Sequence, residues 1–434
     1  MAYVPATLIE VRAWGQTVGA IAPAARGRAY EFEYDPGWVR SGLQLAPALM
    51  PLAARTRYAF PSLPIETFFG LPPMLADALP DSFGNAIVNA SLAREGIPAS
   101  DITALDRLAY LGARGLGALE FLPDTAPHQP PPTALDLADL INSARAAVRG
   151  SLATDAESEE SLRRIIDVGT SAGGARAKAI VNWNPDTDEL RSGHLPPVDG
   201  FQPWLLKFDG VGDDQQLGRS GNYGRIEYAY SLMAAAAGIR MSDTRLLHEN
   251  GRAHFMTRRF DRADDGSKIH LQTLCALDGL DFRLTATHDY AQLFNRIDEL
   301  ALGPDALEQA WRRMAFNVAA ANCDDHTKNF SFLFDPDAGW RISPAYDVTH
   351  AYSPTSKWTN QHLMSVDGEF GDIRRLHLMA VADRYQVAGA SRILEEIAGV
   401  TDSWPEFAAQ AELPSAAIDE VGRDLRPGAL LQKN

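Results

Sequence analysis

The segment NCDDHTKN, residues 322–329, constrains the fold of this chain more than any other stretch. It follows a run that opens with Gly303 and Pro304 and repeats apolar residues at spacings of three and four, as an amphipathic helix does. Two apolar runs joined by the turn DPDAG come next and predict a β-hairpin. A loop of charged and amide side chains between a helix and a hairpin is a place where a chain can assemble a polar site.

Phosphoryl transfer uses the residue types that this loop and the end of the hairpin supply. Asp324 and Asn329 are five positions apart, and Asp347 follows the predicted hairpin. In such a reaction one carboxylate accepts the proton of the attacking hydroxyl, while an amide oxygen and a second carboxylate bind Mg²⁺ beside the phosphates. We assign the base to Asp324 rather than Asp325, because only Asp324 gives the five-residue step to Asn329.

Residues suited to binding a nucleotide lie upstream, in the order that such a site needs. A glycine-rich loop spans 169–174, Lys207 ends a predicted strand, and Glu227 lies on the next predicted helix. A lysine held by a glutamate can pair with nucleotide phosphates. Each motif alone is weak evidence for a nucleotide site, since D-x-x-x-x-N is more often a solvated helix end and a lone lysine is usually on the surface. All of them in this order within about 180 residues favour an ATP- and Mg²⁺-dependent phosphotransferase.

Composition narrows the class of protein. A chain of 434 residues is long enough for two or three domains, and no run of 18 apolar residues predicts a membrane span. The first residues do not read as a secretory signal, and two cysteines fit a reducing cytoplasm rather than a disulfide scaffold. A net charge of −16 disfavours direct binding of DNA or RNA. We therefore expect a cytoplasmic protein that reaches nucleic acid only through a partner.

The distribution of prolines and apolar runs indicates how the chain is divided. Four prolines in DTAPHQPPPT, 124–133, predict a linker. Alternating runs before it predict strands, and helical patterns follow at about 74–95 and 101–111. Beyond it we expect one helix at 134–148 and another at 224–240, strands at 177–183 and 202–210, and a hairpin around Asn250 and Gly251. A mainly helical half begins near residue 285.

Several motifs together resemble those of the HipA family of serine/threonine kinases, the toxins of bacterial type II toxin–antitoxin modules. They are SAGGARAK, FMTRRFDR, NCDDHTKNFSFL and ISPAYDVTHAY, with FEYDPGW, LPDSFGN and LGARGLGALEF resembling the family's N-terminal subdomain. The resemblance covers nearly all of the chain and implies an α+β, bilobal protein-kinase-like fold. It divides the chain into an N-terminal subdomain, a linker, a part of the kinase N-lobe and a mostly helical C-lobe, at 1–123, 124–133, 134–262 and 263–434.

The resemblance also implies roles for individual residues. Asp324 matches the catalytic aspartate, Asn329 and Asp347 match the Mg²⁺ ligands, and Ser171 matches an autophosphorylated serine whose modification switches the kinase off. Arg259 and Phe260 match the hinge beside adenine. The full set of implied ATP-binding residues is Ser171, Ala172, Gly173, Gly174, Ala175, Lys178, Lys207, Glu227, Arg259, Phe260, His326 and Lys328. Two departures are the absence of proline or glutamate before Lys178 and the pair Gln272-Thr273 where relatives often carry acidic residues.

Partners and substrate follow from the same resemblance. Relatives bind a small helix-turn-helix antitoxin, HipB, which makes the DNA contacts. Their growth inhibition comes from phosphorylating a protein of translation, and an aminoacyl-tRNA synthetase is a candidate. The sequence itself identifies no particular protein substrate.

Three other functions are compatible with parts of the sequence. The residues GTSAGG also match the nucleophile elbow of a patatin-like hydrolase with Ser171 as nucleophile, but residues 1–168 contain no glycine-rich oxyanion loop. A metal hydrolase built on Asp324, Asp325, His326 and His350 lacks an H-E-x-x-H spacing. A catalytically silent regulatory relative would have no need of the complete set of polar residues.

Overall fold

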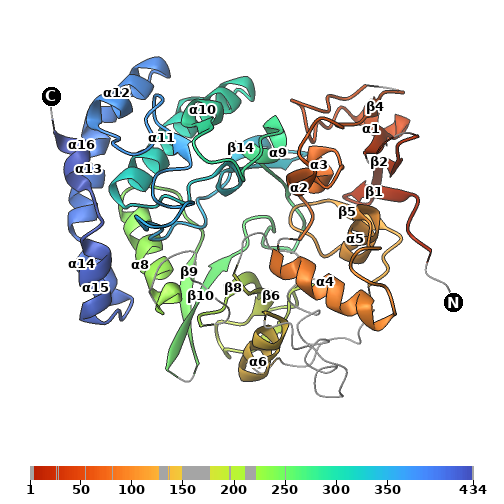
Figure 1. Cartoon of the computed structure of the whole chain (residues 1–434), viewed down its shortest axis with the longest axis horizontal. Helices are drawn as coiled ribbons and strands as arrows, with labels where there is room; N and C mark the ends of the chain where they lie inside the picture. Colours follow the sequence, from red (N-terminus) through yellow and green to blue (C-terminus); the bar gives the residue numbers. More distant parts are fainter. Residues whose placement is uncertain are drawn as a thin grey trace. The chain divides into compact units, whose positions relative to one another are not determined.

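The computed structural model describes most of the chain and divides it into two compact units. The described residues are 4–25, 27, 29–53, 55–80, 82–126, 135, 137–148, 176–194, 197–210, 221–249 and 251–432. The first unit comprises Met1–Gly212, Arg258–Asp281 and Leu333–Ala338. The second unit comprises Asp213–Thr257, Phe282–Phe332 and Gly339–Asn434. Figure 1 shows the helices and strands of both.

The first unit begins with an antiparallel sheet of five strands in the order β4-β3-β2-β1-β5. Its apolar side chains alternate along β1, as the sequence predicts, with Ile9, Val11 and Ala13 fully buried. Trp14 and Gly15, both with positive φ, form the two-residue turn between β1 and β2, a geometry that matches strand twist. The strands are β1 (Ile9–Ala13), β2 (Gln16–Pro23), β3 (Tyr30–Tyr34), β4 (Arg57–Tyr58) and β5 (Glu120–Leu122).

The first unit also contains seven described helices, of which α1 and α5 contact this sheet, and a second set of strands. The helices are α1 (Pro36–Ser41), α2 (Ile65–Phe68), α3 (Pro73–Ala76), α4 (Ser82–Arg94), α5 (Ala104–Leu111), α6 (Leu137–Val148) and α9 (Leu274–Asp278). β6 (Lys178–Trp183) pairs with β7 (Leu190–Ser192) on one side and with β8 (Gln202–Lys207) on the other, both antiparallel. β11 (His270–Thr273) lies just before α9. The predicted strands at 177–183 and 202–210 are therefore confirmed.

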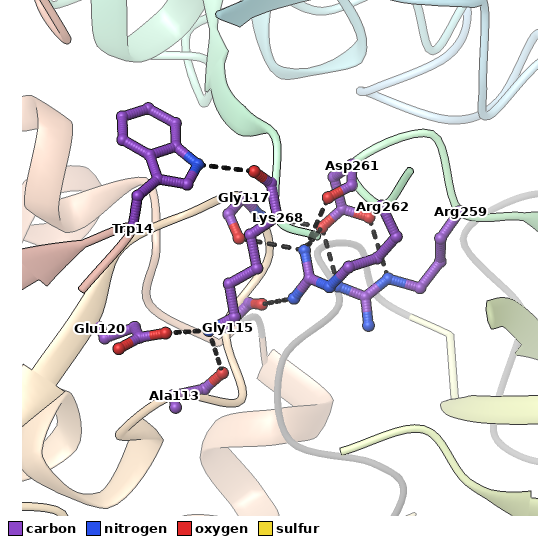
Figure 2. Close-up of polar contacts among 9 residues, drawn as sticks. All are labelled: Trp14, Ala113, Gly115, Gly117, Glu120, Arg259, Asp261, Arg262 and Lys268. Atoms are coloured by element: carbon purple, nitrogen blue, oxygen red, sulfur yellow. Dashed lines mark hydrogen bonds and ion pairs between the residues drawn. The ribbon is translucent and has the colours of Figure 1, made fainter. Parts of the chain in front are cut away.

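A buried polar cluster ties the N-terminal subdomain to the segment 258–281 inside the first unit (Figure 2). Asp261 lies at its centre and is 2% exposed. Its carboxylate accepts the backbone N–H of Gly117 at 2.8 Å and pairs with both Arg259 and Arg262 at 2.7 and 2.9 Å. Burial alone would raise the pKa of Asp261, but the two guanidinium groups hold this pKa well below its usual range.

The second unit is mainly helical and begins with α8 (Tyr223–Ala236) and a hairpin. β9 (Thr244–Glu249) pairs antiparallel with β10 (Arg252–Arg258), as the Asn250–Gly251 turn predicts. A Cβ on Gly224 would lie 2.1 Å from the carbonyl oxygen of Ala253, so only glycine lets α8 approach β10 this closely.

In the rest of the second unit, α11 (Pro304–Ala319) packs against α10, α13 and α16 and confirms the helix predicted from apolar spacing. Trp311, Met314 and Phe316 of α11 are fully buried. Figure 1 shows α14 beside α8, and α15 packs against α14, all in the second unit. The remaining elements are β12 (His288–Asp289), α10 (Tyr290–Glu299), the 3₁₀ helix η2 (Thr327–Asn329), β13 (Ser331–Asp335), which crosses between the units, β14 (Gly339–Ile342), β15 (Met364–Ser365), α12 (Arg375–Arg384), α13 (Ala390–Asp402), α14 (Trp404–Gln410), α15 (Ser415–Gly422) and α16 (Pro427–Leu431).

A search of the described residues for a bilayer-spanning helix finds none with the length and apolar character required.

Candidate active site

Backbone hydrogen bonds bring the loop after α11 and the segment after β14 together in the second unit. The N–H of Cys323 donates to the carbonyl of Ala351 at 3.1 Å, and the N–H of Ala351 donates to Ala321 at 3.2 Å. The hydroxyl of Tyr346 donates to the carbonyl of Lys328 at 2.6 Å. These bonds place residue 347 beside residues 324–329, so the chain connects the two acidic segments that the sequence singles out.

Asn329 closes the loop that carries Asp324. It is the last residue of η2, and its side-chain N–H donates to the backbone carbonyl of Asp324 at 2.8 Å. This bond fixes the five-residue spacing as a compact turn and leaves the amide oxygen of Asn329 as the atom suited to a hard cation.

Asp324 is partly exposed, with 26% of its side chain accessible, and it lies among groups of both charges. Burial raises the pKa of Asp324, while His326 and the hydrogen bond from Trp358 oppose this rise. The negative charge of Asp347, in the neighbouring segment, raises the pKa of Asp324 further. A partly exposed carboxylate with a raised pKa is well suited to accept a proton.

Asp347 is held in a strained backbone conformation. Its φ is +52°, in the left-handed region that an aspartate rarely adopts. Such strain persists only where surrounding contacts impose it, and it is concentrated at functional sites. Asp347 and Asp324 together offer a dication two neighbouring negative charges, with the amide oxygen of Asn329 as a third oxygen donor. These residues fit Mg²⁺ by their chemistry.

Asp325 has a different role from Asp324, although it is adjacent in sequence. It is 1% exposed, and both of its oxygens accept hydrogen bonds. The hydroxyl of Tyr290 and the ring of His362 donate to one oxygen at 2.7 and 2.8 Å, and the N–H of Leu363 donates to the other at 2.8 Å. Because these bonds occupy both oxygens of Asp325, the geometry agrees with Asp324 as the reactive carboxylate.

His362 is buried against Asp325 and carries a positive charge at neutral pH. Burial alone would lower the pKa of His362, but the carboxylate of Asp325 raises this pKa to about 10. The folded state therefore keeps a proton that the unfolded state releases near pH 6.5. The stability from this pair is fully present below that pH and is lost as pH rises through the folded pKa.

We accordingly expect the free energy of unfolding to fall between pH 7 and 9. The slope from this one proton is about 1.4 kcal/mol per pH unit. Urea unfolding at several pH values measures it, and His362→Gln removes the titrating group while keeping a hydrogen-bond donor. Equal pH slopes in wild type and His362→Gln would contradict the assignment.

Two other predicted nucleotide-binding residues, His326 and Lys328, lie next to Asp324 and Phe282. The Nε2 atom of His326 is 3.8 Å from Oδ1 of Asp324, and its ring centroid is 5.3 Å from that of Phe282. The Nζ atom of Lys328 lies 5.0 Å from the centroid of the same Phe282 ring. The structure thus places His326 beside the Asp324 carboxylate and the ammonium of Lys328 over the aromatic ring that His326 also contacts.

Lys178 and Lys207 lie in the first unit, directly opposite each other on β6 and β8. They are 2% and 8% exposed. Directly opposed residues of an antiparallel pair have their side chains on the same face of the sheet, and like charges there repel each other. The strand register therefore places Lys178 and Lys207 on the same face of the sheet. The resemblance implies both residues as ATP ligands; the structure places them opposite each other on neighbouring strands, and their binding of ATP stays a prediction.

The remaining predicted site residues are placed as follows. Glu227 is buried on α8 of the second unit, and its pairing with Lys207 stays a prediction. The guanidinium of Arg259 is occupied by a two-point bond to Asp261, at 2.9 and 2.7 Å (Figure 2), so the predicted adenine contact would fall to the backbone or to half-buried Phe260. Ser171, Ala172, Gly173, Gly174 and Ala175 lie outside the described residues, as does most of the predicted linker.

The four residues of the alternative metal hydrolase, Asp324, Asp325, His326 and His350, do not form a single metal site. His350 bonds to Asp424 at 3.0 Å, and Asp325 is occupied by His362 and Tyr290. Across the part of the chain that the structure describes, no group of three or more histidine, cysteine, aspartate or glutamate side chains is arranged to hold a metal. The three residues that fit Mg²⁺, Asp324, Asn329 and Asp347, are not a group of this kind, because Asn329 is an amide.

The sequence motifs did not identify Trp358 and His362, whose side chains contact the two aspartates. The indole N–H of Trp358 donates to Oδ1 of Asp324 at 2.6 Å. It lies 34 residues further along the chain, in a segment without helical or strand periodicity. Only the tertiary fold brings it to the site, so no local pattern could have found it.

Comparisons with known proteins give the same family for both halves of the chain. A family model described as HipA N-terminal domain matches residues 9–122, and one described as HipA-like C-terminal domain matches residues 170–404. The curated protein "Putative kinase Y4mE" of Sinorhizobium fredii is 27% identical over 285 residues, which span 60% of this chain and 60% of that protein.

A solved structure shows the same fold over nearly the whole length. A chain of the "Shewanella oneidensis MR-1 Toxin Antitoxin System HipA, HipB and its operator DNA complex" matches with a TM-score of 0.67 at 16% identity, covering 96% of this chain and 95% of that chain. The expected α+β architecture is confirmed. Because the C-terminal model alone matches more than half of the chain, the protein belongs to the HipA family.

Proposed function

We propose that this protein is an ATP- and Mg²⁺-dependent serine/threonine protein kinase and the toxin of a type II toxin–antitoxin pair. The observation that carries the proposal is the contrast between two neighbouring aspartates. Asp325 is buried with both oxygens bonded, whereas Asp324 is partly exposed, has a raised pKa and lies in a loop that hydrogen bonds join to the segment of Asp347. The family relation to a named kinase supports the same reaction class.

The residues of the chain would divide the work of phosphoryl transfer. Asp324 accepts the proton of the attacking serine or threonine hydroxyl as the new oxygen–phosphorus bond forms and the bond to the leaving ADP breaks. Asn329 and Asp347 would hold Mg²⁺, which supplies positive charge against the phosphates when bound. Lys178 and Lys207 would bind phosphate oxygens. Autophosphorylation at Ser171 would add negative charge to the glycine-rich loop at 169–174 and oppose ATP binding.

The proposed partner is a small helix-turn-helix antitoxin related to HipB. The structural relative was solved with HipB and operator DNA. With a net charge of −16, this chain would leave the DNA contacts to a basic partner. The substrate class is a protein of translation, with an aminoacyl-tRNA synthetase as candidate.

The test is transfer of labelled phosphate from ATP to the purified chain or to proteins of a cell lysate. We expect wild type to transfer phosphate and Asp324→Ala to reduce the rate at least about 100-fold, because the proton acceptor is gone. Asp337→Ala removes an exposed aspartate from the hairpin turn and should keep the full rate. Peptide mass spectrometry of the same reaction locates the phosphate, expected at Ser171. No transfer by wild type, or an undiminished rate for Asp324→Ala, would disprove the kinase proposal.

A further inference from the structure

Trp358 lies in a short loop, 353–359, that is closed by its own hydrogen bonds. The N–H of Ser353 donates to the carbonyl of Thr359 at 3.2 Å. The hydroxyl oxygen of Ser356 accepts the N–H groups of Trp358 and Thr359, both at 3.1 Å. The backbone that carries the indole is therefore fixed locally, in the manner of a serine turn.

The indole of Trp358 makes the closest contact to Asp324. Its N–H donates to Oδ1 at 2.6 Å, a short distance for a nitrogen donor and an ionised acceptor. The Nε2 atom of His326 lies 3.8 Å from the same oxygen. Within the described residues no hydrogen bond reaches Oδ2 of Asp324. The two neighbours thus hold one oxygen and leave the other to accept a proton.

The bond from Trp358 to Asp324 differs from an indole bond that only stabilises the fold. Trp404 shows what such a bond looks like in the same unit, because its indole N–H donates to the backbone carbonyl of Ile418 at 3.0 Å and its side chain is 2% exposed. Trp358 is instead only half-buried, and its acceptor is a partly exposed carboxylate. The structural aspartate of the loop is Asp325, which does not contact this indole.

We propose that Trp358 is a positioning residue for phosphoryl transfer. By bonding Oδ1 it fixes the orientation of the Asp324 carboxylate, so that Oδ2 meets the hydroxyl of the acceptor protein. The inference rests on the proposed function of Asp324. A correctly oriented base acts in the transfer step, so the residue contributes to kcat and leaves the affinity for ATP unchanged.

The kinetic experiment compares Trp358→Phe with Trp404→Phe in the transfer assay on cell-lysate proteins, over a range of ATP concentrations. We expect Trp358→Phe to lower kcat by about 10- to 100-fold with the KM for ATP within about twofold of wild type, as for loss of a hydrogen bond to a charged group. Trp404→Phe removes a core indole and should lower the thermal midpoint while keeping kcat. A wild-type kcat in Trp358→Phe, or a loss of kcat matched by Trp404→Phe, overturns the inference.

A spectroscopic experiment tests the hydrogen bond without relying on activity. The eight tryptophans give indole N–H signals in a ¹⁵N-labelled full-length protein, and the signal absent in Trp358→Phe belongs to Trp358. We expect this signal to shift in Asp324→Ala while that of Trp404 stays. An unshifted signal overturns the inference, even if the kinase proposal holds. If wild type transfers no phosphate, the proposed function fails, and the positioning role fails with it even where the signal shifts.

Discussion

Asp325→Ala is expected to destabilise the protein by about 3–5 kcal/mol, enough to unfold many variants at physiological temperature. The substitution leaves the ring of His362 buried without its hydrogen-bond acceptor and counter-ion, since both side chains are at most 3% exposed, and burial then favours the neutral imidazole. It also removes the acceptor of the Tyr290 hydroxyl and of the N–H of Leu363. Buried donors left without an acceptor cost more than their hydrogen bonds contributed, which is why removing one partner is worse than replacing both by apolar groups.

Urea unfolding measures this effect, with Asp424→Ala as the matched control. Asp424 also pairs with a histidine, His350, at 3.0 Å in the same unit, but its side chain is 31% exposed. We expect that control to lose less than about 1 kcal/mol, as exposed ion pairs do. Similar losses in the two variants would contradict the view that burial makes the Asp325–His362 pair important.

Asp324→Ala completes the comparison. We expect Asp325 to contribute to the stability of the fold and Asp324 to the reaction. Asp324→Ala is expected to keep its unfolding midpoint and lose activity. Asp325→Ala is expected to lose stability first, and any loss of activity should follow the fraction of unfolded protein. This separation is the clearest way to show which of the two adjacent carboxylates takes part in the reaction.

The sequence predicts local features well because periodicity and turn chemistry act over short distances. The helix at 304–319, the hairpin at Asn250 and Gly251 and the strands of residues 178–183 and 202–207 all appear where apolar spacing and glycine place them. The turn from Asp324 to Asn329 follows from a five-residue spacing that one side-chain bond can close.

Long-range polar contacts could not be predicted in this way. Trp358 and His362 reach the two aspartates from 34 and 37 residues away, and the backbone of Gly117 reaches Asp261 across 144 residues. Their partners are chosen by the packing of whole elements, and no pattern within a window of sequence encodes that choice. The motif around Arg259 illustrates the point, because the family resemblance implies a hinge beside adenine there, while the side chain of Arg259 is bound to Asp261.

Asp261→Ala is the second substitution with a large expected effect, a loss of about 3–5 kcal/mol in the free energy of unfolding. It leaves the guanidinium groups of Arg259 and Arg262 buried beside each other without the carboxylate that separates their charges (Figure 2). Burial lowers the pKa of Arg262, and the positive charge of Arg259 lowers it further, to about 10. The two guanidinium groups therefore repel each other strongly. The N–H of Gly117 also loses its acceptor.

Asp264→Ala is the matched control, since Asp264 pairs with Arg258 at 2.7 Å in the same segment but is 95% exposed. We expect it to change stability by less than about 1 kcal/mol. Because Arg262 also donates to the carbonyls of Gly115 and Gly117, loss of Asp261 should expose the loop at 113–120 to hydrogen exchange and to proteases before the rest of the first unit. Protection of that loop unchanged in Asp261→Ala would mean that apolar packing, rather than this cluster, holds the N-terminal subdomain to residues 258–281.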